Sequence, residues 1–243
     1  MVQLGKVLVA LLAGTGLVSV IQAFQLLAER GHVRDIVITA GPDVGLRMQG
    51  VFGSQPIAGI LSAVTLAAGV VWLVWQHRGH ANVLAGGTQG LKYTPGWAVG
   101  WWFVPLANFV MPYLTMRELW DNVGRGGSGA PRSRDRRPIT VWWFGYLVAT
   151  FVMLGAFGAL VPSFASWVRA APTTAPGEFP TLTFTAAALR QFYLWAAVGD
   201  LFRALAAGLA IGVVRTISRR EDAAPVPMAH VLPIGWTPPR PDL

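Results

Sequence analysis

The stretch GWAVGWWFVPLANFVMPYLTMRELW, residues 96–120, decides how the rest of the chain is arranged. It is apolar enough to resemble a membrane span, but Pro105 and Pro112 each remove a backbone donor and kink or break a helix. The loops on both of its sides are basic, and the positive-inside rule keeps such loops in the cytoplasm. We therefore expect a re-entrant or interfacial segment that enters and leaves on one side. A fifth crossing is the alternative, because a long apolar run can outweigh the charge of its loops.

The composition places the whole chain in a membrane. Of 243 residues, 53% are apolar and 12% are charged, against about 25% charged in soluble domains. These figures exclude a disordered chain and argue against an ordinary soluble enzyme. The absence of Cys excludes disulfides, thiolate metal sites and cysteine nucleophiles. The net charge of +8 lies in short loops between apolar runs, so it indicates membrane topology and not nucleic-acid binding.

Four further runs have the roughly 20 apolar residues that a membrane-spanning helix needs. They cover about residues 7–27, 56–75, 141–168 and 186–214. The first run is longer than the apolar core of a signal peptide and no A-x-A cleavage site follows it, so we expect it to be retained as a helix. Residues 1–220 are thus predicted to be one all-α integral membrane domain with four transmembrane helices and both termini in the cytoplasm.

The connections between these runs carry weaker signals. A short strand is expected within residues 33–40, inside the loop that follows the first helix. The Pro-rich residues 221–243 are expected to be a disordered cytoplasmic tail. Arginines of the loop before the third span are candidates for contact with anionic lipid headgroups. These arginines are Arg132, Arg134, Arg136 and Arg137.

Asp200 and Arg203 are the ionisable residues that lie deepest in a predicted span. Counted back from Arg215 at 1.5 Å per residue, they lie about 22 Å and 18 Å from the end of the helix. Their i,i+3 spacing permits pairing, and a self-neutralising structural pair is the first interpretation. An ion path or polar ligand site is the second, because ionisable residues at membrane depth are often functional. Small residues continue the same face, and the pair Gly208 and Gly212 predicts close packing of another helix.

The second half of residues 96–120 has the pattern of an amphipathic helix suited to the membrane interface. Its apolar side comprises Phe109, Tyr113, Met116 and Trp120, and its polar side comprises Thr115, Glu118 and Asn122. Asn108, between the two prolines, is expected to satisfy carbonyls that the broken helix exposes. Eight tryptophans are expected to form an aromatic belt at the cytoplasmic face. They are Trp72, Trp75, Trp97, Trp101, Trp102, Trp120, Trp142 and Trp143.

The motif of residues 96–120, together with LAIGVVRTISRRE at 209–221, resembles a domain-of-unknown-function family of bacterial multi-pass membrane proteins. The resemblance covers about residues 50–222 and implies an integral membrane protein without implying an activity. It points to one set of motif residues. These are Trp97, Trp102, Pro105, Asn108, Pro112, Met116, Glu118 and Trp120.

No catalytic, cofactor or metal motif stands out. His77 and His80 lack a nearby carboxylate or further histidine, so we expect a solvated loop there and not a metal site. The leading hypothesis is a non-enzymatic membrane component that binds a partner protein, a second copy or a lipid. The alternative is a small-solute or ion transporter that uses Asp200 and Arg203. A membrane-embedded enzyme comes third, with Glu118 as its candidate acid or base.

Overall fold

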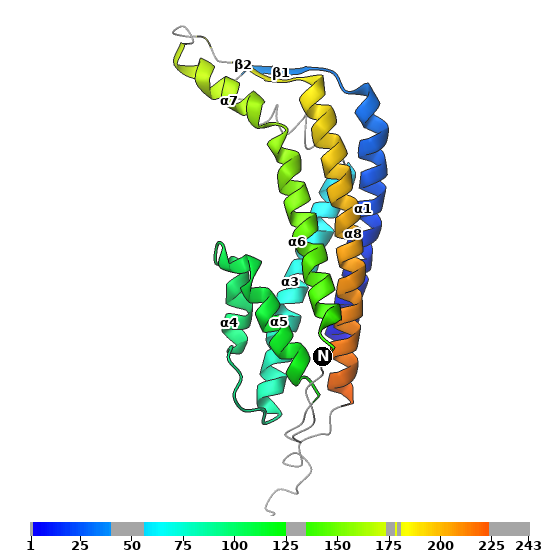
Figure 1. The fold of residues 1–243 in the computed structure, drawn as a ribbon. Helices are drawn as coiled ribbons and strands as arrows, with labels where there is room; N and C mark the ends of the chain where they lie inside the picture. Colours follow the sequence, from blue (N-terminus) through cyan, green and yellow to red (C-terminus); the bar gives the residue numbers. More distant parts are fainter. Residues whose placement is uncertain (1, 40–55, 125–134, 174–177, 179–180, 224–243) are drawn as a thin grey trace, which may run out of the picture.

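Four long helices form an up-and-down bundle in the computed structural model, which describes residues 2–39, 56–124, 135–173, 178 and 181–223 (Figure 1). The helices are α1 (Val2–Glu29), α3 (Pro56–Ala85), α6 (Arg137–Gly158) and α8 (Ala186–Asp222). Within the described residues, these four segments are long and apolar enough to cross a membrane. Helix α8 is central, because α1 and α6 both pack along it while α3 packs on α1. The all-α prediction is confirmed.

The two ends of the bundle differ in charge. Helix α1 begins and α8 ends at the lower end in Figure 1, where α3 also ends and α6 begins. We call this the basic end, after its cationic residues. They are Lys6, Arg78, Lys92, Arg136, Arg219 and Arg220. Helix α8 continues to Asp222, and most of the expected tail of residues 221–243 lies outside the described residues. Arg132 and Arg134 lie outside them as well.

The outer faces of the helices are apolar. Phe24 on α1, Leu66 on α3 and Phe151 on α6 each expose more than half of their surface. A helix that is apolar all round lies either in the core of a large protein or in a membrane, and no further layer of the described residues covers these faces. Helix α8 begins where Thr185 caps it, as the Thr185 hydroxyl accepts from the Ala188 amide at 3.2 Å.

A small two-stranded sheet closes the other end. Strand β1 (Ile36–Thr39) pairs antiparallel with β2 (Thr181–Phe184), which confirms the strand expected within residues 33–40. The 3₁₀ turns η1 (Arg30–His32) and η4 (Ala171–Thr173) flank this region. The side chains of Ile38, Leu182 and Phe184 form a core there with Leu160 and Leu189.

The third predicted span lies within Arg137–Ala170, which is long and apolar enough to cross a membrane, but the structure divides this segment into two helices. A continuous helix was expected over residues 141–168, but α6 ends at Gly158 and the chain turns into α7 (Val161–Ala170) at an angle to the bundle (Figure 1). The amides of Ala159 and Leu160 bond back three residues, which tightens the last turn. Pro162 then has no amide to donate, so the α-helical ladder stops there.

Residues 95–122 fold into a hairpin beside the lower half of α3. It comprises α4 (Pro95–Gly100), η2 (Trp101–Phe103), η3 (Ala107–Phe109) and α5 (Met111–Asn122). In Figure 1, α4 leads away from the basic end and α5 returns to it. The reversal lies at Leu106, whose φ of 64° is left-handed. The hairpin therefore does not cross the bundle, and its entry into a bilayer stays a prediction.

Candidate functional site

Gln76 of α3 holds the hairpin to the bundle. Its Oε1 accepts from the indole nitrogens of Trp72 at 3.1 Å and Trp102 at 2.9 Å. Its Nε2 donates to the Ala98 carbonyl and to the Thr115 hydroxyl, both at 3.0 Å. The amide thus uses two lone pairs and two protons, and Gln76 is completely buried. Three separate parts of the hairpin, in α4, η2 and α5, meet at this one side chain.

Aromatic rings surround the Gln76 amide. Trp72 stacks on Trp142 of α6 with ring centroids 5.0 Å apart, and Trp102 meets Trp143 edge-on at 5.9 Å. Tyr146 completes the group, 5.2 Å from Trp143 and 5.9 Å from Trp102. These rings join α3, the hairpin and α6 at the basic half of the bundle.

The expected aromatic belt is therefore wrong for most of its members. Five of the eight tryptophans are buried inside the protein, and only Trp97 is largely exposed. The buried ones are Trp72, Trp75, Trp120, Trp142 and Trp143. Indole rings bury much apolar area and one N–H. The N–H groups of Trp72 and Trp120 find acceptors within the chain, whereas that of Trp75 is buried without one.

Helix α5 also differs from its expected pattern. Thr115, assigned to the polar side, is buried beside Met116 and Trp120, because Gln76 offers its hydroxyl a partner. The helix packs this face into the protein and not into lipid. The amide of Asn108 donates to the Val104 carbonyl at 3.0 Å, whereas its buried side-chain Oδ1 has no hydrogen-bond partner. The side-chain role expected for Asn108 thus stays a prediction.

Glu118 fixes the start of the hairpin. Its carboxylate accepts from the backbone amides of Lys92 at 2.5 Å and Tyr93 at 3.2 Å, and these residues lead into α4. A carboxylate that bonds two backbone amides anchors a loop, which gives Glu118 a structural role.

The end of α5 is tied to α6 and α8. The Arg136 guanidinium makes a salt bridge of 2.7 Å to Asp121, and this hydrogen-bonded contact raises the pKa of Arg136. Trp120 donates its indole N–H to the Asp135 carbonyl at 3.0 Å, and the Arg220 guanidinium lies 4.2 Å from its ring centre. Arg136 is thus engaged by protein, while Arg137 keeps an exposed side chain.

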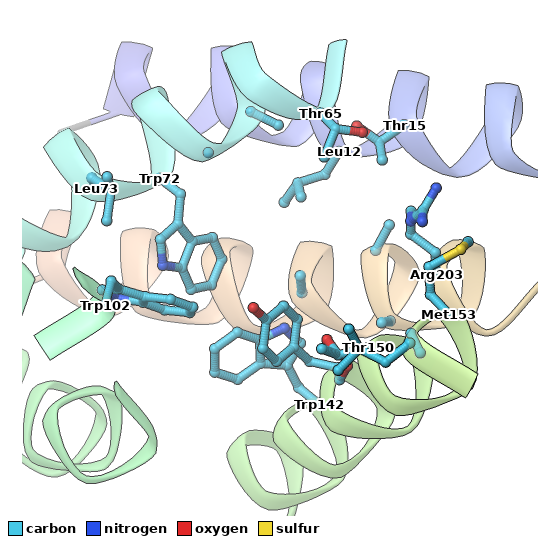
Figure 2. A pocket seen from close by; sticks show the side chains of 18 of the residues that line it. Leu12, Thr15, Thr65, Trp72, Leu73, Trp102, Trp142, Thr150, Met153 and Arg203 are labelled. Carbon is cyan, nitrogen blue, oxygen red and sulfur yellow. The ribbon is translucent and has the colours of Figure 1, made fainter. Parts of the chain in front are cut away.

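A cavity of about 590 Å³ lies between α1, α3, α6 and α8 above the aromatic cluster (Figure 2). Trp72 and Trp102 lie at the end of the cavity nearest the basic end of the bundle, and Phe103 and Trp142 also contribute to the lining. Its lining is mostly apolar. The remaining lining residues are Leu12, Thr15, Thr65, Ala68, Gly69, Leu73, Tyr146, Ala149, Thr150, Met153, Leu154, Arg203, Ala206, Ala207 and Ala210.

The cavity opens sideways. The backbones of α3 and α6 stay apart, and the two helices meet through the stacked rings of Trp72 and Trp142. Both helices contribute to the lining. Thr65 and Gly69 of α3 and Leu154 of α6 line the cavity and are also solvent-exposed. The opening therefore lies between these two helices, on the apolar outer surface of the bundle.

Arg203 and Asp200 meet at the wall of the cavity. Arg203 Nη1 donates to Asp200 Oδ1 at 2.7 Å. The carboxylate is completely buried and its Oδ2 has no partner, whereas the Arg203 side chain is 29% exposed and lines the cavity. Figure 2 shows the guanidinium at the end of the cavity opposite Trp72 and Trp102.

The close helix contacts are not at the predicted glycines. Gly208 and Gly212 are exposed, and a Cβ on either would meet nothing within 4 Å in the described chain. Other glycines make the close approaches: a Cβ would lie 2.6 Å from Ser218 Oγ at Gly5, 3.3 Å from Leu209 Cδ1 at Gly145 and 3.3 Å from Met153 Cε at Gly199. Packing at Gly208 and Gly212 against another chain stays a prediction.

Sequence reasoning missed Gln76 and misplaced His80. Helix α3 continues to Ala85, so His80 is buried in a helix and the expected solvated loop is wrong for it. Its Nδ1 lies 3.0 Å from the Gln76 carbonyl, and its Nε2 is buried without a partner. Gln76 follows Trp72 by four residues in an apolar run, a spacing that does signal a shared helix face. No cluster of potential metal ligands occurs among the residues that the structure describes.

Comparison with known proteins gives one match. The sequence model of a family described as "Domain of unknown function (DUF4328)" matches residues 51–219, more than half of the chain. None of the curated proteins matches, and none of the solved structures does.

Proposed function

The chain belongs to this family of unknown function, and we propose that it is an integral membrane protein that binds a lipid-like ligand in the cavity between its four helices. The observation that carries the proposal is the mainly apolar cavity that opens between α3 and α6. Its volume falls within the roughly 300–1,000 Å³ of small-molecule sites. A ligand dissolved in the bilayer would reach it through this opening without passing through water.

We also propose how the protein is oriented in the membrane. The basic end lies in the cytoplasm by the positive-inside rule, and the apolar outer faces of the helices contact lipid. The tip of the hairpin carries Phe103, Leu106 and Val110, and Leu106 is 81% exposed. A tip of this kind is suited to the inner leaflet, which makes the hairpin the re-entrant segment expected from the sequence.

Apolar area alone does not explain selective binding in a membrane. Lipid tails are as apolar as leucine, so moving a hydrocarbon chain from bilayer to cavity gains little hydrophobic free energy. Affinity must come from shape and from placed polar or aromatic contacts. The cavity supplies both, with stacked indoles at one end and Arg203 at the other.

A substitution at the mouth tests the proposal. Gly69 lines the opening and a Cβ there meets nothing within 4 Å, and the same holds for Gly59, which is on α3 but away from the cavity. Gly69→Phe should narrow the opening without disturbing α3, and Gly59→Phe is the matched control. Native mass spectrometry of protein purified in mild detergent is expected to show a retained lipid in wild type and Gly59→Phe, and its loss in Gly69→Phe. Equal retention in all three proteins, or retention in none, would contradict lipid binding in the cavity.

A carrier that uses Asp200 and Arg203 is the second candidate. It is favoured by the buried, unpartnered Oδ2 of Asp200 next to a cavity-lining arginine. Proton or ion flux in proteoliposomes that Asp200→Asn abolishes would support it. Lipid retention without such flux would favour binding alone.

A further inference from the structure

Given the proposed function, on which this inference rests, we infer that the ligand is an uncharged amphiphile. Its oxygen, such as an ester or ketone carbonyl, accepts a hydrogen bond from Arg203, and its apolar part extends toward Trp72, Trp102 and Trp142.

Arg203 is the charged donor of the cavity. A guanidinium has five N–H groups in a planar fork, and the Asp200 bond engages one terminal nitrogen. Two nearby hydroxyls are committed to their own helices, since Thr15 donates to the Leu11 carbonyl at 3.0 Å and Thr150 to the Tyr146 carbonyl at 2.9 Å. An acceptor that enters from the mouth therefore meets donor groups at Arg203.

The charge of this wall disfavours an anionic ligand. Asp200 already neutralises Arg203, and no other ionised side chain of the described residues lines the cavity. An acidic ligand would add a net negative charge close to the buried Asp200 carboxylate. Taking such a charge out of water is costly where no opposite charge remains to compensate it. A neutral carbonyl keeps the hydrogen bond and avoids this cost.

The depth of Arg203 in the bundle also favours an uncharged ligand. It lies 17 residues from the first and 19 residues from the last residue of α8, or about 26 Å and 28 Å at 1.5 Å per residue. An ordinary phospholipid would have to bring its phosphate from the membrane surface to the middle of the bundle. The carbonyl of an uncharged amphiphile reaches this depth without moving a charge.

The other end of the cavity suits an apolar group. The indole nitrogens of Trp72 and Trp102 both donate to Gln76, so these rings present carbon edges and faces to the cavity. The stacked pair of Trp72 and Trp142 forms a flat wall there. Among the described lining residues the charged donor is thus Arg203, while the hydroxyls of Thr65 and Tyr146 are neutral polar groups of the same cavity. The direction of the ligand follows from the position of the guanidinium opposite the indoles.

Quenching of tryptophan fluorescence by dibrominated probes tests the inference in the full-length protein. The three probes share one chain: dibrominated methyl stearate, dibrominated stearate and dibrominated octadecane. Titrations are made at about pH 9, well above the ordinary pKa of a carboxyl group. Wild type is expected to bind the methyl ester most tightly. Arg203→Gln should weaken ester binding about 10-fold or more, the value of a hydrogen bond to a charged donor, and leave octadecane binding unchanged.

Asp200→Asn provides the opposite perturbation. It leaves Arg203 uncompensated, so the preference should shift toward the stearate anion. Tighter binding of stearate than of the ester by wild type would overturn the inference, and this ranking requires no variant to fold. An ester preference that persists in Arg203→Gln would overturn it as well. If every probe quenches the wild-type protein no more than it quenches Gly69→Phe, the cavity is not a lipid site.

Discussion

Replacing Gln76 by Met should release the hairpin from α3 while the bundle stays folded. Met has a similar length and no polar amide, so the change removes hydrogen bonds with little change in volume. It leaves the indole N–H groups of Trp72 and Trp102 and the carbonyl of Ala98 without their partner. Each neutral hydrogen bond contributes about 1 kcal/mol, and a buried group left unsatisfied costs about 1–3 kcal/mol. Four hydrogen bonds are lost. Two losses are partly compensated, because water reaches the half-buried Trp102 and the Thr115 hydroxyl keeps its bond to the Pro112 carbonyl. The expected loss of free energy holding the hairpin to α3 is therefore about 3 kcal/mol.

Hydrogen exchange measured by mass spectrometry detects the loss of this stabilising free energy in the hairpin separately from the rest of the protein. A loss of about 3 kcal/mol raises the population of the opened hairpin roughly 150-fold, so amides of residues 95–122 should exchange faster by about this factor. Amides in the middle of α1 and α8 should keep their rates. Gln191→Met, at an exposed glutamine of α8, is the matched control and should change nothing in the hairpin. Unchanged protection of the hairpin in Gln76→Met would refute the role given to this residue.

Two further substitutions follow from individual contacts. Gly124→Ala should destabilise the fold by about 1–3 kcal/mol, because Gly124 has a φ of +79° and the added methyl would lie 2.6 Å from the Arg220 carbonyl oxygen. Gly212→Ala in open space should instead stabilise α8 by up to about 1 kcal/mol. Thermal unfolding in detergent should thus shift in opposite directions, and equal shifts would contradict the packing described. Asp121→Asn should lower the free energy of unfolding by only about 0.5–1 kcal/mol, because its partner Arg136 is more than a third exposed. Raising the salt concentration should reduce this difference from wild type in the same thermal-unfolding assay.

The long helices and the returning segment could be predicted from the hydropathy of the sequence. Four apolar runs became four long helices, and the two prolines with their basic flanks indicated a segment that returns to its starting end. The strand within residues 33–40 was also predicted, but its partner β2 was not. The break between α6 and α7 was not predicted, because Pro162 lies inside an otherwise continuous apolar run and hydropathy does not register a missing amide.

The site was less predictable because its contacts are distant in sequence. Gln76 meets Ala98, Trp102 and Thr115, which are 22, 26 and 39 residues away, and no local pattern specifies such a meeting. Hydropathy also gives the same value to an indole in lipid and an indole in a protein core, so the aromatic belt was misplaced. Asp200 and Arg203 were identified because i,i+3 spacing is local, but their place on a cavity wall depends on α1, α3 and α6 together.

Photolabelling tests the central claim, a lipid-like ligand in a cavity that opens between α3 and α6, most directly. The protein in lipid nanodiscs is irradiated with a diazirine-bearing methyl ester of a long-chain fatty acid, and labelled residues are mapped by mass spectrometry. We predict labels concentrated on cavity-lining peptides around Gly69, Met153 and Ala206, which disappear in Gly69→Phe and persist in Gly59→Phe. Labelling spread evenly over the outer faces, at residues such as Phe24 and Leu66, and equal in all three proteins would contradict the account.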